Sequence, residues 1–119
     1  MTYCEQYGFD KQKAKVIARA FGGGMGRTCQ TCGAVTGSYM VLGLKFEQEN
    51  EKDAKNKTYE LVKIFDRKFK EKHGSVNCKQ LLGCDLGTIE GQDYYKQNHL
   101  NENCKMYVSD AAKILNEIL

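Results

Sequence analysis

Residues 53–72 read DAKNKTYELVKIFDRKFKEK and carry the clearest helical pattern in this chain of 119 residues. Leu61, Val62, Phe65 and Phe69 recur at spacings of three and four, which places them on one face of an α-helix. Charged residues fill most of the remaining positions, and Gly74, a typical residue after a helix end, closes the stretch. The pattern predicts a long amphipathic helix that turns its apolar face to a core.

Helical signals also occur on both sides of this stretch. Asp10 is a favourable N-cap, and three glycines at 22–24 end the segment that it begins. We expect helices over 10–21, 32–44, 77–82 and 88–98 and from 101 to the end. The apolar positions are Ala14, Val16, Ile17, Ala20 and Phe21 in the first, and Cys104, Val108, Ala111, Leu115 and Ile118 in the last.

No stretch alternates apolar and polar residues as a half-buried strand would. The predicted fold is therefore all-α, a small bundle of four to six helices joined by glycine-rich turns. The length suits one domain over residues 1–119.

Charge and hydropathy limit the function classes. The chain has 18 basic and 15 acidic residues, a net charge of +3, and the basic residues are interleaved with acidic ones, so we expect no nucleic-acid binding. The most apolar run, 34–44, is too short to span a bilayer. The N-terminal residues lack the apolar stretch of a signal peptide, and we expect a cytoplasmic protein.

Six cysteines are many for a chain expected in a reducing compartment. There, clustered cysteines serve more often as metal ligands or catalytic thiols than as structural crosslinks. Cys29 and Cys32 form a C-x-x-C motif, and both are candidate catalytic residues. Cys32 begins the helix predicted over 32–44, where the helix dipole and nearby Arg27 are expected to lower its thiol pKa.

The other cysteines differ in context. Cys78 and Cys84 flank the short segment NCKQLLGCD, a spacing too wide for a zinc knuckle but compatible with two thiols facing one cavity across a turn. Cys104 lies on the apolar face of the last helix, whereas Cys4 is expected to be incidental. The metal-ligand candidates are Cys32, Cys78, Cys84 and Cys104. We expect the two histidines, His73 and His99, to be solvated or helix-capping rather than metal ligands.

The glycines form two groups. The loop FGGGMGR at 21–27 matches neither a dinucleotide fingerprint nor a P-loop, and predicts a tight turn whose backbone amides are available to a thiolate, a cluster or an anion. Gly33 and Gly37 lie four apart on one helical face, so another backbone could approach them closely. The cofactor-binding candidates are Gly22, Gly24, Gly33 and Gly37.

These features together resemble one known family. The blocks FGGGMGR (21–27), TCGAVTG (31–37), GSYMVLGL (37–44), NCKQLLGCDL (77–86) and NCKMYV (103–108) are similar to the C-GCAxxG-C-C family, over nearly the whole chain. By position, Cys32, Cys78 and Cys104 correspond to family cysteines. The fourth family cysteine lies upstream of the glycine loop, and three alternatives stay open: a shifted Cys4, a missing upstream residue, or completion of the set by Cys84 or Cys29.

The resemblance implies a redox-active protein, of a kind often encoded near transporters. We therefore expect a thiol-based redox or electron-transfer protein, in which an iron–sulfur cluster held by cysteines is one option. The alternatives are a non-catalytic site for zinc or another thiolate-bound metal ion, and a transporter-associated accessory protein. The expected partner is a redox protein or a transporter-associated protein, and a homodimer is left open.

Overall fold

The computed structural model describes residues 3–119, and its regular structure in this range is helical. The α-helices are α1 (Lys11–Ile17), α2 (Gly22–Met25), α3 (Gly33–Lys45), α4 (Glu51–His73), α5 (Cys78–Leu82), α6 (Ile89–Gln97) and α7 (Asn101–Ile118), with 3₁₀ turns at Glu5–Tyr7 and Arg19–Phe21. The all-α prediction is confirmed.

The expected number of four to six helices is wrong, because the described residues form seven. The additional helix is α2, a single turn within the glycine loop, closed by a bond from the Gly26 N–H to the Gly22 carbonyl. Gly23 and Gly24 have φ values of +65° and +68°, outside the helical region. Glycine adopts this conformation at little cost, so three successive glycines make a turn where a helix end was predicted.

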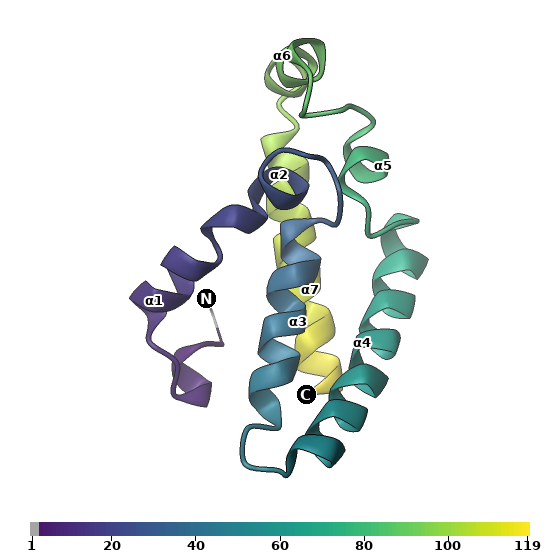
Figure 1. Ribbon diagram of the computed structural model, residues 1–119. Coiled ribbons are helices and arrows are strands. Elements are labelled where there is room, and N and C mark those ends of the chain that lie inside the picture. Colours follow the sequence, from purple (N-terminus) through teal and green to yellow (C-terminus); the bar gives the residue numbers. More distant parts are fainter. Residues whose placement is uncertain (1–2) are drawn as a thin grey trace.

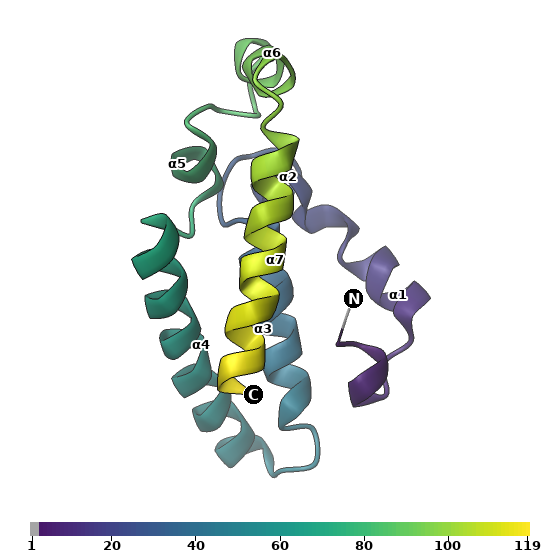
Figure 2. The same cartoon turned by 180° about the vertical axis from the view of Figure 1, so that it is seen from behind.

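The three longest helices form the body of the molecule. α3, α4 and α7 each contact the other two and run side by side in both views (Figures 1 and 2). Phe65 and Phe69 of α4 are fully buried between them, and their rings stack with centroids 5.9 Å apart. The apolar face predicted for 53–72 therefore does face the core, whereas Tyr59 on the same helix is 55% exposed.

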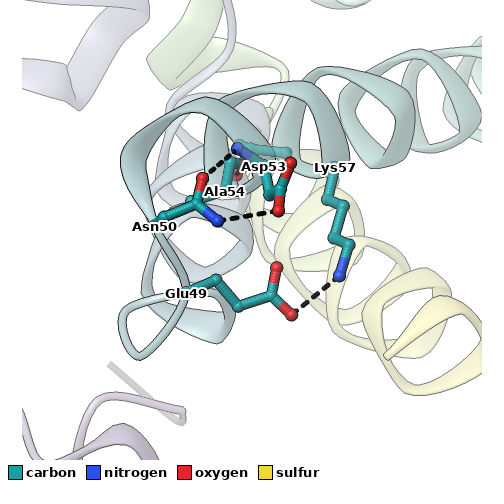
Figure 3. Close-up of polar contacts among 6 residues, drawn as sticks. Glu49, Asn50, Asp53, Ala54 and Lys57 are labelled. Atoms are coloured by element: carbon teal, nitrogen blue, oxygen red, sulfur yellow. Dashed lines mark hydrogen bonds and ion pairs between the residues drawn. The ribbon is translucent and has the colours of Figure 1, made fainter.

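The start of α4 is fixed by a local cap, drawn in Figure 3. The Asn50 side chain accepts a hydrogen bond from the Asp53 N–H at 3.0 Å and donates one to the Asp53 carboxylate at 2.8 Å. Lys57 pairs with Glu49 at 2.8 Å across the same turn. An asparagine cap satisfies a backbone N–H that otherwise has no helical partner, and this explains why α4 begins at Glu51.

Two apolar faces predicted from the sequence are only partly buried. In α7, Ala111 and Leu115 of the predicted stripe are buried, and so are Tyr107 and Ile114 outside it. Val108 is 59% exposed, which contradicts its place on the predicted stripe. In α1, Val16 and Ile17 are about half exposed. The face of α7 that meets the core is thus rotated from the predicted one.

His73, the last residue of α4, is neither solvated nor a simple cap. Its side chain is buried, its Nε2 lies 2.9 Å from an Asp110 carboxylate oxygen on α7, and its ring lies against Phe69 and Tyr107. Lys72 reaches the other oxygen of Asp110 at 3.2 Å. Burial acts to raise the Asp110 pKa, but Lys72 and His73 outweigh it and hold the pKa below its ordinary value. His99 is exposed, as expected.

The short helices gather at one end of the bundle. α2, α5 and α6 lie around the first turns of α7, away from the loop that joins α3 to α4 (Figure 1). Five of the six cysteines lie in or beside these short helices and at the starts of α3 and α7: Cys29, Cys32, Cys78, Cys84 and Cys104. Within residues 3–119, no helix combines the length and apolar character needed to cross a bilayer.

Candidate functional site

Two segments far apart in the sequence are joined by backbone hydrogen bonds at the short-helix end. The Cys78 N–H donates to the Gln30 carbonyl, and the Lys79 N–H to the Cys29 carbonyl. In the opposite direction the Cys32 N–H donates to the Val76 carbonyl at 2.8 Å, and Thr31 forms an antiparallel bridge with Asn77. This pairing of 29–32 with 76–79 places both cysteines of the C-x-x-C motif beside Cys78.

The closest pair of thiols is Cys29 and Cys78. Their Sγ atoms lie 3.6 Å apart, and both side chains are buried, at 4% and 6% exposure. Cys29 Sγ also accepts a hydrogen bond from the Leu86 N–H at 3.3 Å and lies 3.4 Å from the Cys84 carbonyl oxygen. The loop after α5 therefore holds the Cys29 thiol against Cys78.

Backbone conformation directs Cys29 into this position. Its φ is +57°, in the left-handed region that residues with a side chain seldom adopt. The Cys29 N–H donates to the Gly23 carbonyl at 3.1 Å and the Gln30 N–H to the Gly24 carbonyl at 2.8 Å, and these bonds hold the conformation. The glycine loop thus fixes the direction of a cysteine that follows it in the sequence.

Gly24 is the tightest point of this arrangement. A β-carbon added there would lie 2.6 Å from Cys78 Cβ, 2.7 Å from the Gln30 nitrogen and 2.9 Å from Cys29 Cα. Real Cβ atoms essentially never lie so close to another heavy atom. Gly24, a candidate for cofactor binding, therefore has a packing role at the Cys29–Cys78 pair.

The other three candidate glycines differ in their surroundings. Gly33 is closely approached by the Phe21 carbonyl oxygen, 3.0 Å from the position of an added β-carbon, as predicted for a small residue on that face. The same prediction is wrong for Gly37, where an added β-carbon meets nothing within 4 Å. Gly22 likewise has open space, and it lines the cavity described next.

A cavity of about 760 Å³ opens between α2, α5, α6 and the starts of α3 and α7. Cys32, Cys78 and Cys104 all line it, together with the glycines of the loop. These are the three cysteines that correspond by position to the resembled family. The sequence predicted that Cys78 and Cys84 face one cavity across a turn, but Cys84 is not among the lining residues.

Cys32 is the N-cap residue of α3, as predicted. The direction of its pKa shift was predicted wrongly, because burial raises the pKa of this thiol. The N–H groups of Ala34 and Val35, at the helix start, act to lower the pKa but do not outweigh burial, and the Cys104 sulfur adds to the rise. Arg27 is not among the groups that shift it.

The pKa of Cys78 is raised most strongly, first by burial and then by its contact with Cys29, with Cys32 and Cys104 adding further repulsion between thiolates. Burial also raises the pKa of Cys84, and the charges on Cys29 and Asp85 act in the same direction. These cysteines lie close enough together that a thiolate on one of them disfavours a thiolate on another. The raised pKa values thus favour the neutral thiol form of Cys32, Cys78 and Cys84.

Cys104 carries a tyrosine partner. The Tyr95 hydroxyl, on α6, donates to Cys104 Sγ at 3.6 Å, and burial together with this contact raises the Tyr95 pKa to about 12. Tyr107 on the same helix as Cys104 donates to the Leu81 carbonyl at 2.9 Å. The two tyrosines fix α5 and α6 against α7 and so support the wall of the cavity.

The four cysteines predicted as metal ligands are not arranged as a metal site in the described residues. Within the described residues, 3–119, no group of three or more Cys, His, Asp or Glu side chains could hold a metal ion as arranged. Cys4, which was expected to be incidental, is buried at 4% exposure in a separate apolar pocket with Phe9, Met40 and Leu44.

Several residues of the site had no signal in the sequence. Arg19, Tyr95 and Lys96 line the cavity, and Gln92 anchors α6 through a 2.9 Å bond to the Leu86 carbonyl. Arg19 lies in the helix predicted over 10–21, and the other three lie in a polar stretch that carries no motif. Only the three-dimensional approach of α6 to the glycine loop identifies them.

Comparison with known proteins gives the family of this chain. Searches of curated proteins and of solved structures gave no match. The model of one protein family, described as "Putative redox-active protein (C_GCAxxG_C_C)", matches residues 1–118. This match covers the glycine loop and all six cysteines, and the chain therefore belongs to the C_GCAxxG_C_C family.

Proposed function

We propose that this chain is a thiol-based redox protein in which Cys29 and Cys78 alternate between a dithiol and a disulfide. The observation that carries the proposal is the 3.6 Å separation of the two sulfur atoms. A side-chain movement of between 1 and 2 Å, roughly, would bring them to bonding distance. Of this pair, Cys78 lines the cavity and Cys29 does not, so Cys78 is the thiol of the two that an incoming disulfide meets first.

The reaction follows thiol–disulfide exchange. The Cys78 thiolate attacks one sulfur of the substrate disulfide, forming a mixed disulfide and expelling the first substrate thiolate. The Cys29 thiolate then attacks Cys78 Sγ, forming the Cys29–Cys78 bond and expelling the second. The two protons lost by Cys29 and Cys78 are taken up by the two substrate thiolates, and two electrons pass from the chain to the substrate.

Burial of the thiols supports one direction of electron flow. Strongly oxidising dithiol proteins have a reduced form that is stabilised as a thiolate. Here burial raises the pKa of Cys78, Cys32 and Cys84, so the reduced form lacks this stabilisation. We therefore assign the chain the role of electron donor, with slow exchange at neutral pH that accelerates as pH rises. Such a dithiol would persist in the cytoplasm, where thiols are kept reduced.

The test is oxidation of the reduced protein by oxidised glutathione, followed by mass spectrometry of its peptides. We expect loss of two hydrogen atoms and a crosslink between Cys29 and Cys78. Cys29→Ala and Cys78→Ala should each abolish the crosslink. Cys4→Ala is the matched control, because Cys4 is as deeply buried but lies outside the cavity, and it should leave the crosslink intact. Crosslinks confined to other cysteine pairs would refute the assignment.

A second candidate, favoured by the three cysteines that line one cavity, is a thiolate-held metal ion or an iron–sulfur cluster on Cys32, Cys78 and Cys104. The described side chains do not fit a metal in their present positions, so binding would require them to move. Metal analysis and visible absorption of anaerobically purified protein test it. Retained iron or zinc that Cys32→Ser removes and Cys4→Ser leaves would support it; metal-free, colourless protein would reject it.

A further inference from the structure

The cavity that Cys78 lines has a charge that the proposed reaction does not explain. Three cationic side chains line it, Arg19 from the turn before α2, Arg27 from the glycine loop and Lys96 from α6. No Asp or Glu is among its lining residues, although the chain has 15 acidic residues against 18 basic ones. The wall around the thiols is therefore positively charged while the chain as a whole is nearly balanced.

Two other charged grooves among the described residues are mixed in sign. The groove beside α1 combines Glu5 and Asp10 with Lys11 and Lys15. The groove along α4 combines Asp66 and Glu71 with three basic residues. One-signed charge is thus a property of the cysteine-lined cavity and does not follow from the net charge of +3.

The three cations are not used inside the protein. Among residues 3–119, Arg19, Arg27 and Lys96 form no ion pair and no side-chain hydrogen bond, whereas Lys57, Lys68 and Lys72 are paired with carboxylates. The Arg27 side chain packs closely against Gly23, where an added β-carbon would lie 2.8 Å from Arg27 Cγ. Guanidinium groups in such a setting bind carboxylates or phosphates in pairs of hydrogen bonds.

Size and lining indicate the kind of ligand. A volume of about 760 Å³ is that of a small-molecule site, and Leu82, Leu86 and Val108 supply apolar surface between the cations. Resting on the proposed dithiol function, we infer that the substrate of Cys78 is a small disulfide bearing carboxylate groups. The cations bind its carboxylates and so present the sulfur–sulfur bond to Cys78, and the two thiols released carry the same charged groups away.

The experiment compares three disulfides of different charge, dithiodipropionate with two carboxylates, the neutral hydroxyethyl disulfide, and cystamine with two ammonium groups. The rate of Cys29–Cys78 crosslinking is followed by quenching and mass spectrometry. We expect dithiodipropionate to react about tenfold faster than the neutral compound at low salt and cystamine to react slowest, with the differences reduced at high salt.

Variants distinguish the effect of the cations in the cavity from the effect of the net charge of the protein. Arg27→Gln and Lys96→Gln are each expected to reduce the ratio of the dithiodipropionate rate to the hydroxyethyl disulfide rate severalfold. Taking this ratio cancels any general loss of reactivity in a variant. Lys63→Gln, an equal change of charge on the exposed side of α4, should leave the ratio unchanged. Lys96 is exposed on α6, so its variant tests the idea even if Arg27→Gln fails to fold.

The outcomes distinguish the two proposals. If none of the three disulfides produces the Cys29–Cys78 crosslink, the proposed function fails. If all three produce it at rates that do not depend on charge, or if Lys63→Gln changes the ratio as much as Arg27→Gln and Lys96→Gln, the dithiol function stands and the anionic substrate is rejected.

Discussion

Gly24 and Cys78 approach so closely that a β-carbon on Gly24 would lie 2.6 Å from Cys78 Cβ. Gly24 also has a φ of +68°, which a residue with a side chain adopts only under strain. The contact joins the glycine loop to the start of α5, 54 positions later in the chain. It therefore links the packing of the loop to the position of the thiol.

Gly24→Ala is expected to destabilise the protein by about 1–3 kcal/mol through overpacking, with backbone strain adding to the cost. Gly37→Ala is the matched control. An added methyl group meets nothing within 4 Å there, and alanine should stabilise the middle of α3 by roughly 0.5–1 kcal/mol. Urea unfolding measures both, and equal effects of the two substitutions would disprove the close contact.

Stability is expected to fall as pH rises above the ordinary thiol pKa of 9.0, because the pKa of Cys78 is raised in the folded protein. Below that pH the Cys78 thiol is protonated in both the folded and the unfolded protein, so its titration costs no stability. Above it, the unfolded chain loses the proton and the folded protein keeps it, which favours unfolding by up to about 1.4 kcal/mol per pH unit for each such group.

Cys78→Ala should flatten this alkaline decline relative to the unmodified protein. Urea unfolding under reducing conditions, from about pH 7 to about pH 10, measures both slopes. The raised pKa values of Cys32, Cys84 and Tyr95 act in the same direction, so part of the decline will remain in the Cys78 variant. Identical slopes in the unmodified protein and the Cys78 variant would contradict the assignment.

The buried pair of Asp110 and His73 predicts how the stability of the protein changes at acid pH. The Asp110 pKa is lowered in the folded protein, so its contribution is present above the ordinary value of 3.8 and is lost as pH falls through the folded value. Asp110→Asn is expected to cost about 1–3 kcal/mol near pH 7, because it weakens a buried hydrogen bond to His73. Its stability should also depend less on pH below about 4, as thermal unfolding would reveal.

Asn50→Ala should destabilise the protein by about 1 kcal/mol, because it removes the side chain that caps α4. Asn56→Ala makes the same chemical change at an exposed position inside α4 and is expected to be neutral or slightly stabilising, since alanine favours helix. The comparison uses thermal or urea unfolding. A loss of stability in Asn56→Ala as large as that in Asn50→Ala would argue against the cap.

Helix positions could be predicted from the sequence because their ends depend on neighbouring residues. Asn77 caps α5 and Gly83 ends it in the left-handed conformation, so the predicted range 77–82 lies within one residue of the observed Cys78–Leu82. The apolar faces of α1 and α7 were predicted less well. Whether Val16 or Val108 is covered depends on which helix lies beside it, and periodicity within one segment carries no such information.

The cysteine site could be predicted only in part, for a similar reason. The resemblance pointed to Cys32, Cys78 and Cys104, and the structure has them lining one cavity. The contact between Cys29 and Cys78 depends on the positive φ of Cys29 and on backbone pairing between segments 49 positions apart. The upward pKa shift of Cys32 was missed because a helix start is visible in the sequence, whereas the depth of burial is not.

The separation of Cys29 and Cys78 along the chain has a consequence for the lifetime of the protein. A bond between residues 49 positions apart would enclose α3 and α4 in a covalent ring and disfavour the unfolded chain by roughly 4 kcal/mol through loop entropy. The oxidised form would then open far less often to proteases than the reduced form. Under the proposed chemistry, the amount of this protein in a cell would rise with oxidant load without any change in its synthesis.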